Sequence, residues 1–163
     1  MSVFKSQFSR ALAVIPTDNA NVPYPAPSCI GINTFLSVSS LIDSEASFVT
    51  NNVATGDIVY NTTAKLAATV LVVIDETTLL LNADIFTATA DNYIVYQASS
   101  QNTIGNPGCN LYVGGAGNVK VTTIGQDIIT FTAVPVGTVL PVQVIKVHSV
   151  DSGTTATLIN ALW

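Results

Sequence analysis

Apolar and polar residues alternate along most of this chain, and β-branched residues fill many of the apolar positions. A period of two with little helical spacing predicts an all-β protein. The pattern predicts a turn at Gly56–Asp57 that leads into a strand, in "VATGDIVYNTT". It also predicts two strands that reverse at Asp75–Glu76, in "AATVLVVIDETTLLLNADIF", and a further strand in "NYIVYQ". We expect these short strands to form a small β-barrel or sandwich module over residues 34–100.

A polar break, "ASSQNTIGNPG", has the composition of a linker, and the alternation resumes after it. The strands expected there lie in "CNLYV", "NVKVTT", "DIITFTAV", "VLPVQVIKVHSV" and "TTATLINALW". Together they predict a β-sandwich or jelly-roll-like domain over residues 101–163. The apolar parity changes between Val142–Val144 and Ile145–Val147, which predicts a bulge or a strand buried on both faces.

Residues 1–33 lack the pattern of an independent unit. Prolines at positions 16, 23, 25 and 27 exclude most of this segment from the middle of a sheet. We expect an extended arm that contributes to the outer β domain and covers its own surface or that of a neighbour. Near its start, apolar residues recur at the spacing of one helix face, which favours a docking helix or arm. The candidate interface residues are Phe4, Phe8, Leu12, Pro23, Tyr24, Pro25 and Trp163, of which Trp163 has the alternative role of plugging the domain's own core.

The composition favours a subunit that packs against other proteins. Apolar residues make up 48% of the chain and charged residues only 9%, so Thr, Ser, Asn, Ala and Gly must cover much of the surface. A net charge of −5 with scattered basic residues argues against nucleic-acid binding. The sequence contains no apolar run long enough to span a membrane, and the N-terminus makes a poor secretory signal. We therefore expect synthesis in the cytoplasm and no membrane partner.

The chemistry-bearing residues give little support for an enzyme. His148 is the sole histidine, and with two distant cysteines it makes a poor metal site or catalytic centre. Cys29 and Cys109 could pair, but two small buried thiols are the simpler interpretation. Most carboxylates of the central segment lie at expected turns, where Asp is common. We expect no catalytic residue, no cofactor and no metal.

The stretch "CNLYVGGAGNVKV" contains Gly114, Gly115 and Gly117, the kind of cluster in which phosphate loops are sought. A phosphate cradle needs a helix after the glycines, whereas "NVKVTTIGQDIITF" predicts strands. We expect the glycines to supply positive φ angles for a hairpin between "CNLYV" and "NVKVTT".

Three segments, Leu111–Thr123, Val134–Val144 and Ser152–Trp163, contain "LYVGGAGNVKVTT", "VPVGTVLPVQV" and "SGTTATLINALW". These motifs, with "VIPTDNANVPYP" near the N-terminus, resemble the head-spike base and capsid decoration proteins of tailed bacteriophages, including cyanophages, and of gene transfer agents. The resemblance covers nearly all of residues 10–32 and 103–163. Residues 34–100 resemble a β module that recurs in structural proteins of marine phages.

The resemblance implies a virion structural protein on the capsid exterior, without enzymatic activity. Its implied partners are the major capsid protein, other copies of itself in a homotrimer or homopentamer, and a spike or fibre protein. The alternative is a tail or fibre-associated module that binds glycans on the host surface, with Tyr60, Tyr93 or Tyr96 as the aromatic platform. Core packing explains these tyrosines more simply.

Overall fold

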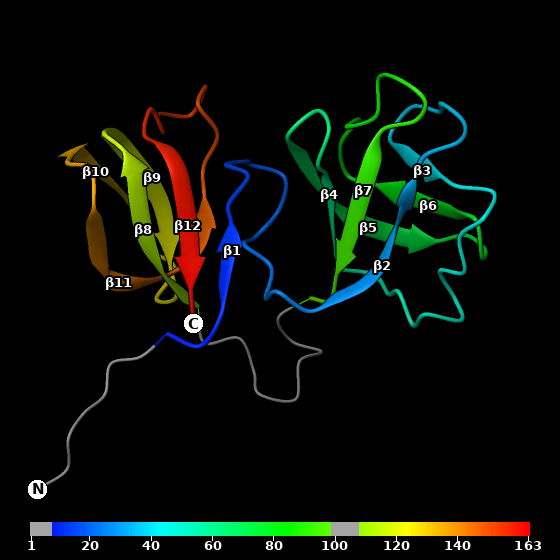
Figure 1. The fold of residues 1–163 in the computed structure, drawn as a ribbon, viewed down its shortest axis with the longest axis horizontal. Coiled ribbons are helices and arrows are strands. Elements are labelled where there is room, and N and C mark those ends of the chain that lie inside the picture. The colour runs from blue at the N-terminus through cyan, green and yellow to red at the C-terminus, as the bar shows by residue number, and fades with distance from the viewer. Residues whose placement is uncertain (1–7, 99–107) are drawn as a thin grey trace, which may run out of the picture.

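The computed structural model describes residues 8–98 and 108–163, which form two antiparallel sheets and contain no helix (Figure 1). Each sheet has six strands, and the two units lie side by side. The prediction of an all-β, sandwich-like protein is therefore confirmed.

The first sheet has the strand order β1-β12-β8-β11-β9-β10. Its strands are β1 (Ala11–Ala13), β8 (Cys109–Gly115), β9 (Gly117–Thr123), β10 (Ile128–Val134), β11 (Thr138–Val147) and β12 (Thr157–Leu162). The first half of β11 pairs with β8 and its second half pairs with β9, with register shifts after Leu140 and after Val144. The predicted bulge in this strand is thus confirmed. The bent sheet encloses a core of small and branched side chains that includes Leu111, Val113, Val121 and Val144.

The second sheet has the order β2-β7-β4-β5-β6-β3. Its strands are β2 (Pro27–Ile32), β3 (Ser40–Ile42), β4 (Ile58–Asn61), β5 (Leu66–Val73), β6 (Thr78–Leu81) and β7 (Asn92–Tyr96). The strand expected after Gly56–Asp57 and the reversal at Asp75–Glu76 are both present. Its core is built from larger side chains and includes Phe48, Leu79, Phe86 and Tyr93.

The N-terminal segment contributes a strand to each sheet. β1 pairs with β12, so Leu12 lies in a strand; of the two alternatives, docking helix or arm, the helix is wrong for the described part of this segment. Pairing with β12 satisfies backbone groups that a short isolated helix would leave to water, since a single helical turn is only marginally stable. β2 pairs with β7 at the edge of the second sheet, and Pro27 begins it, where a missing N–H is tolerated. The second sheet therefore begins before residue 34.

The segment between β1 and β2 joins the two units. The backbone carbonyl of Asn19 accepts hydrogen bonds from Thr69 Oγ1 at 2.8 Å and from Asn82 Nδ2 at 2.7 Å. Beside them, a small apolar cluster joins Leu12 and Ile15 to the rings of Tyr60 and Tyr96. These contacts fix one sheet against the other.

The predicted hairpin between β8 and β9 is wrong, because β11 lies between these two strands in the sheet. The glycines instead allow close approach of backbones. A Cβ at Gly114 would lie 2.8 Å from the carbonyl oxygen of Leu158, and one at Gly117 would lie 2.5 Å from the amide nitrogen of Ala156. Gly117 also has φ +155°, so it is the member of the cluster that does supply a positive φ. The glycines let the chain turn from β8 into β9 against the start of β12.

Candidate functional site

The structure distributes the predicted interface residues between surface and core. Phe4 lies outside the described residues, and Phe8 is exposed just before β1. Leu12 is half-buried and packs against the cluster of Tyr60 and Tyr96, and Pro23 is buried. Of the described candidates, Phe8 alone is exposed, with 43% of its surface accessible to solvent.

Tyr24, Pro25 and Trp163 meet Arg10 in a group that we call the terminal clasp. The rings of Tyr24 and Trp163 contact edge to face with centroids 5.5 Å apart, and the Arg10 guanidinium lies 5.3 Å from the Tyr24 centroid. Arg10 Nη1 donates to the Pro25 carbonyl at 2.8 Å, and the Trp163 amide donates to the Arg10 carbonyl at 2.9 Å. Trp163 is partly buried and packs against the core of the first sheet. The clasp therefore ties the chain's two ends together.

Asp18 is a residue that the sequence analysis did not select, and it organises a polar cluster at the end of β11. His148 Nδ1 lies 2.7 Å from Asp18 Oδ1, while Ser149 Oγ, at 2.5 Å, and Ser152 Oγ, at 2.7 Å, both donate to Asp18 Oδ2. Lys146 Nζ donates to the Asp18 carbonyl oxygen at 3.1 Å. We call these residues the linker clamp, because they hold the segment between β1 and β2 onto the first sheet.

The clamp stabilises the charged form of Asp18. Hydrogen bonds from Ser149, Ser152 and His148 hold the pKa of the carboxyl group well below its usual value, against the opposing effect of desolvation. Since an ionised carboxylate only accepts hydrogen bonds, Nδ1 of His148 carries the proton toward Asp18. The only sequence hint was a short polar run, Thr17-Asp18-Asn19, inside the proline-containing segment.

His148 also contacts Thr122, whose Oγ1 lies 2.9 Å from Nε2 of the imidazole. The order carboxylate, imidazole, hydroxyl is that of a nucleophilic hydrolase. Thr122, however, lies within β9, paired with Ile128 on one side and Lys146 on the other, whereas a nucleophile is best placed on an exposed turn. We therefore interpret the three residues as an extension of the linker clamp.

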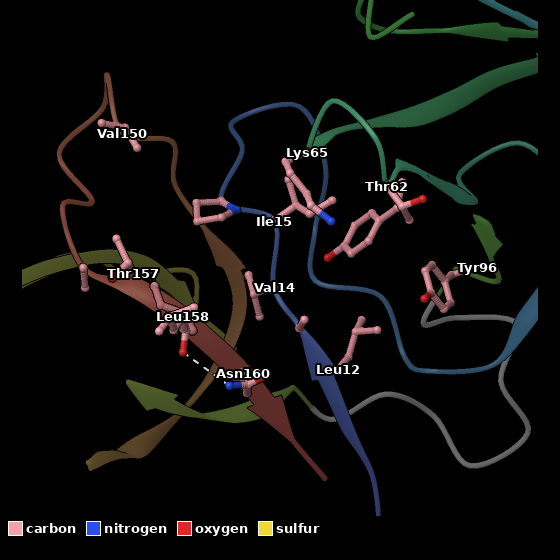
Figure 2. A pocket seen from close by; sticks show the side chains of 15 residues that line it. Leu12, Val14, Ile15, Thr62, Lys65, Tyr96, Val150, Thr157, Leu158 and Asn160 are labelled. Atoms are coloured by element: carbon pink, nitrogen blue, oxygen red, sulfur yellow. Dashed lines mark hydrogen bonds between the residues drawn. The ribbon is translucent and has the colours of Figure 1, made fainter. Parts of the chain in front are cut away.

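Two cavities lie along the join between the units. The larger, about 590 Å³, is lined by apolar side chains of β1 and β12 together with Tyr60, Tyr96 and Lys65 (Figure 2). The second, about 490 Å³, is more polar and is lined by Asp18, Asn82 and Lys146 among others. Neither cavity is lined by Thr122 or His148, so neither brings a substrate to the one hydroxyl–imidazole pair described above.

Large apolar side chains are unusually prominent on the surface. One group lies after β2, where Phe35 is 63% and Val38 77% exposed with Leu36 between them. Another lies on β10, where Ile128 is 64% and Ile129 46% exposed. Clusters of exposed apolar side chains often mark the sites at which a protein associates with a partner. These two groups are the candidate interaction surfaces.

The two thiols and the three candidate sugar-binding tyrosines are buried. Cys29 and Cys109 are free thiols in different cores, and burial raises the pKa of Cys109 to about 12. Tyr60, Tyr93 and Tyr96 are buried, so their rings are not exposed platforms for a sugar. Within residues 8–98 and 108–163, no three His, Cys, Asp or Glu side chains gather as a metal site. The same residues include no helix of the length and apolarity that crossing a bilayer requires.

Comparison with protein-family models, curated proteins and solved structures found no match to this chain.

Proposed function

We propose that this chain is a structural subunit of a virus particle, a capsid decoration (cement) protein or head-spike base that binds the major capsid protein from outside. It catalyses no reaction and stabilises the particle by burying apolar surface against the shell and against copies of itself. The motifs in residues 10–32 and 103–163 support the assignment to a virion, as described above.

The observation that carries the proposal is the exposure of large apolar side chains at Phe35–Val38 and along β10. A specific contact between proteins buries a total of about 1,600 Å². Many copies on one shell then add avidity without further contacts. A low charge content helps, because few charges must lose their hydration when such a surface is covered.

The direct test is made on particles of the virus that encodes the chain. We expect washed particles to hold many copies, measured by quantitative mass spectrometry against the major capsid protein, and density for the two β units outside the shell in a cryo-EM map. Absence of the chain from washed particles would overturn the proposal.

Rebinding to stripped particles tests the surface. The double variant Phe35→Ser with Val38→Ser should rebind at least tenfold more weakly than the unchanged chain. Ser37→Ala, in the same loop, removes no large apolar side chain and should rebind normally. If the double variant rebinds as tightly as Ser37→Ala and the unchanged chain, this loop does not contact the shell.

The alternative, a module for glycans on the host surface, gains nothing from the buried Tyr60, Tyr93 and Tyr96. The full chain applied to a glycan array should give no signal above background. A reproducible hit on one sugar class would favour this alternative over the capsid role.

A further inference from the structure

β10 is an edge strand of the first sheet, and most of its residues are exposed. β10 is the last strand in the order β1-β12-β8-β11-β9-β10, and it pairs only with β9 among the described strands. Figure 1 places it at the outer side of its unit, away from the second sheet. Its other edge is therefore accessible to a further strand.

The hydrogen-bond pattern identifies which backbone groups face outward. The amide of Thr123 donates to the carbonyl of Asp127, and the register continues from there through Ile128↔Thr122 to Phe131↔Val119. In an antiparallel pair, hydrogen-bonded and non-hydrogen-bonded positions alternate. Ile128 and Thr130 thus occupy non-hydrogen-bonded positions toward β9, and their N–H and C=O groups point to the free edge.

Over Ile128–Phe131, this edge lacks the devices that normally block strand addition. Natural edges are protected by shortness, charge, proline or a bulge. Among the four edge strands of the described sheets, β1 and β3 have three residues each and β2 begins with Pro27. The stretch Ile128–Val134 contains no charged residue and no proline, and its irregularity comes only after Phe131.

The core of the first sheet is also open at this edge. Val119 and Val121 are fully buried, and their partners Phe131 and Ile129 point to the same face of the sheet. Yet Ile129 remains 46% exposed and Phe131 is only partly buried. Ile129 and Phe131 therefore face the core but remain open to solvent on the side of the free edge.

We propose that β10 pairs antiparallel with β10 of a second copy of this chain across a two-fold axis at Thr130. This inference rests on the proposed function, in which the chain is a repeated subunit, and it names one surface and its partner. In this register Thr130 meets its own copy, Ile128 lies opposite Thr132, and Ile129 lies opposite Phe131. Ile129 and Phe131 cover each other as an aromatic and β-branched pair, which is a favourable cross-strand combination.

The absence of charge on β10 favours an uncharged partner strand at this edge, and a second β10 is such a strand. The chain has a net charge of −5, so two copies repel each other at long range, but Ile128–Val134 brings no like charges together at the contact. A register shifted by one pair would instead place Asp127 opposite the Phe131 ring. A two-fold contact is also compatible with trimers or pentamers, because it can link neighbouring rings on a shell.

The test is disulfide cross-linking of the purified full chain, without particles. Thr130→Cys should form a covalent dimer within minutes of mild oxidation, because facing Cα atoms about 5.5 Å apart suit a disulfide. Thr132→Cys is the matched control: it is also exposed and lies on the same strand, but it would lie opposite Ile128 and several residue pairs from its own copy. The native Cys29 and Cys109 are buried, so the unchanged chain sets the background.

A second measurement tests the same contact without introducing cysteine. Sedimentation should show a concentration-dependent dimer for the unchanged chain, and Thr130→Lys should raise its dissociation constant at least tenfold by placing two ammonium groups together. Mixing Thr130→Lys with Thr130→Glu should restore dimers. Equal cross-linking of both cysteine variants, or a monomer at every concentration, would overturn the two-fold contact. Particle binding is measured separately, so it can succeed or fail independently of this result.

Discussion

His148 Nδ1 lies 2.7 Å from Asp18 Oδ1, although 130 residues separate them in the chain. Asp18 belongs to the segment that leaves β1 for the second sheet, and His148 follows β11 of the first sheet. The same carboxylate accepts hydrogen bonds from Ser149 and Ser152, so, among the described residues, every partner of its side chain comes from one loop. The arrangement fixes the point at which the chain crosses from one sheet to the other.

Replacing Asp18 with Asn should loosen this crossing. The amide keeps the size of the side chain but loses the charge that strengthens three hydrogen bonds. Because Asp18 is partly exposed, we expect the free energy of unfolding to fall by only about 1 kcal/mol. Urea unfolding followed by circular dichroism measures the change. Asp151→Asn, in the same loop, is the control and should be nearly neutral; an equal loss in both variants would contradict a specific role for Asp18.

The stability of the chain should also depend on pH through Asp18. The fold lowers the pKa of this carboxyl group, so its contribution is fully present above the ordinary Asp value of about 4 and is lost as the pH falls below that value. Between about pH 4 and pH 2 the unchanged chain should therefore lose stability faster than Asp18→Asn. Parallel acid titrations of the two proteins would show this, and curves of identical slope would exclude Asp18 as the titrating group.

The terminal clasp gives a prediction about packing. Trp163→Ala removes the ring that contacts Tyr24 and packs against the core of the first sheet. Since the ring is only partly buried, we expect a loss of about 2 kcal/mol, less than for a fully buried aromatic residue. Tyr112→Ala, on the outer face of β8, is the matched control and should cost under about 0.5 kcal/mol. Thermal unfolding followed by circular dichroism separates them, and equal melting temperatures would show that Trp163 adds nothing to the fold.

Local patterns predicted the individual strands well. Alternation and turn residues placed the strand after Gly56–Asp57 and the reversal at Asp75–Glu76, because both depend on neighbours within a few residues. The parity change between Val144 and Ile145 likewise predicted the bulge in β11, where the register shifts between Val144 and Lys146. These features follow from side chains that lie close together in sequence.

Pairings between distant segments could not be predicted in the same way. The glycines after Val113 look like a hairpin turn, but β11, which comes later in the chain, lies between β8 and β9. The spacing of Leu12 fits one face of a helix, but this segment forms a strand because it pairs with β12, at the other end of the chain. The contact of Asp18 with His148 depends on both sheets being formed. Sequence periodicity carries no information about which distant strand becomes the neighbour.

A buried hydrogen bond gives a further test of the second core. The hydroxyl of Tyr93, which is fully buried, donates to Asp43 Oδ2 at 2.7 Å. Tyr93→Phe leaves this buried carboxylate oxygen without its donor, so we expect a loss of about 2 kcal/mol. Tyr96→Phe is the control, because no described residue hydrogen-bonds to the Tyr96 side chain, and it should change stability by less than about 0.5 kcal/mol. The urea concentration at the midpoint of unfolding measures both variants. Equal midpoints for Tyr93→Phe and Tyr96→Phe would mean that the hydrogen bond to Asp43 contributes nothing to stability.

Two glycines with positive φ differ sharply in their surroundings: Gly117, in the turn from β8 into β9, is crowded, whereas Gly137, just before β11, is open. A Cβ at Gly117 would lie 2.5 Å from Ala156 N and 2.7 Å from the carbonyl carbon of Thr155, both backbone atoms that cannot move aside. At Gly137, φ is +83° and no atom lies within 4 Å of the added Cβ. Gly137→Ala should therefore show backbone strain alone, about 1 kcal/mol, whereas Gly117→Ala should lose about 3 kcal/mol or more. Chemical unfolding measures both values. If the two variants lose equal stability, then the close approach of Thr155 and Ala156 is not what excludes a side chain at position 117, and the glycine would be needed only for its backbone angle.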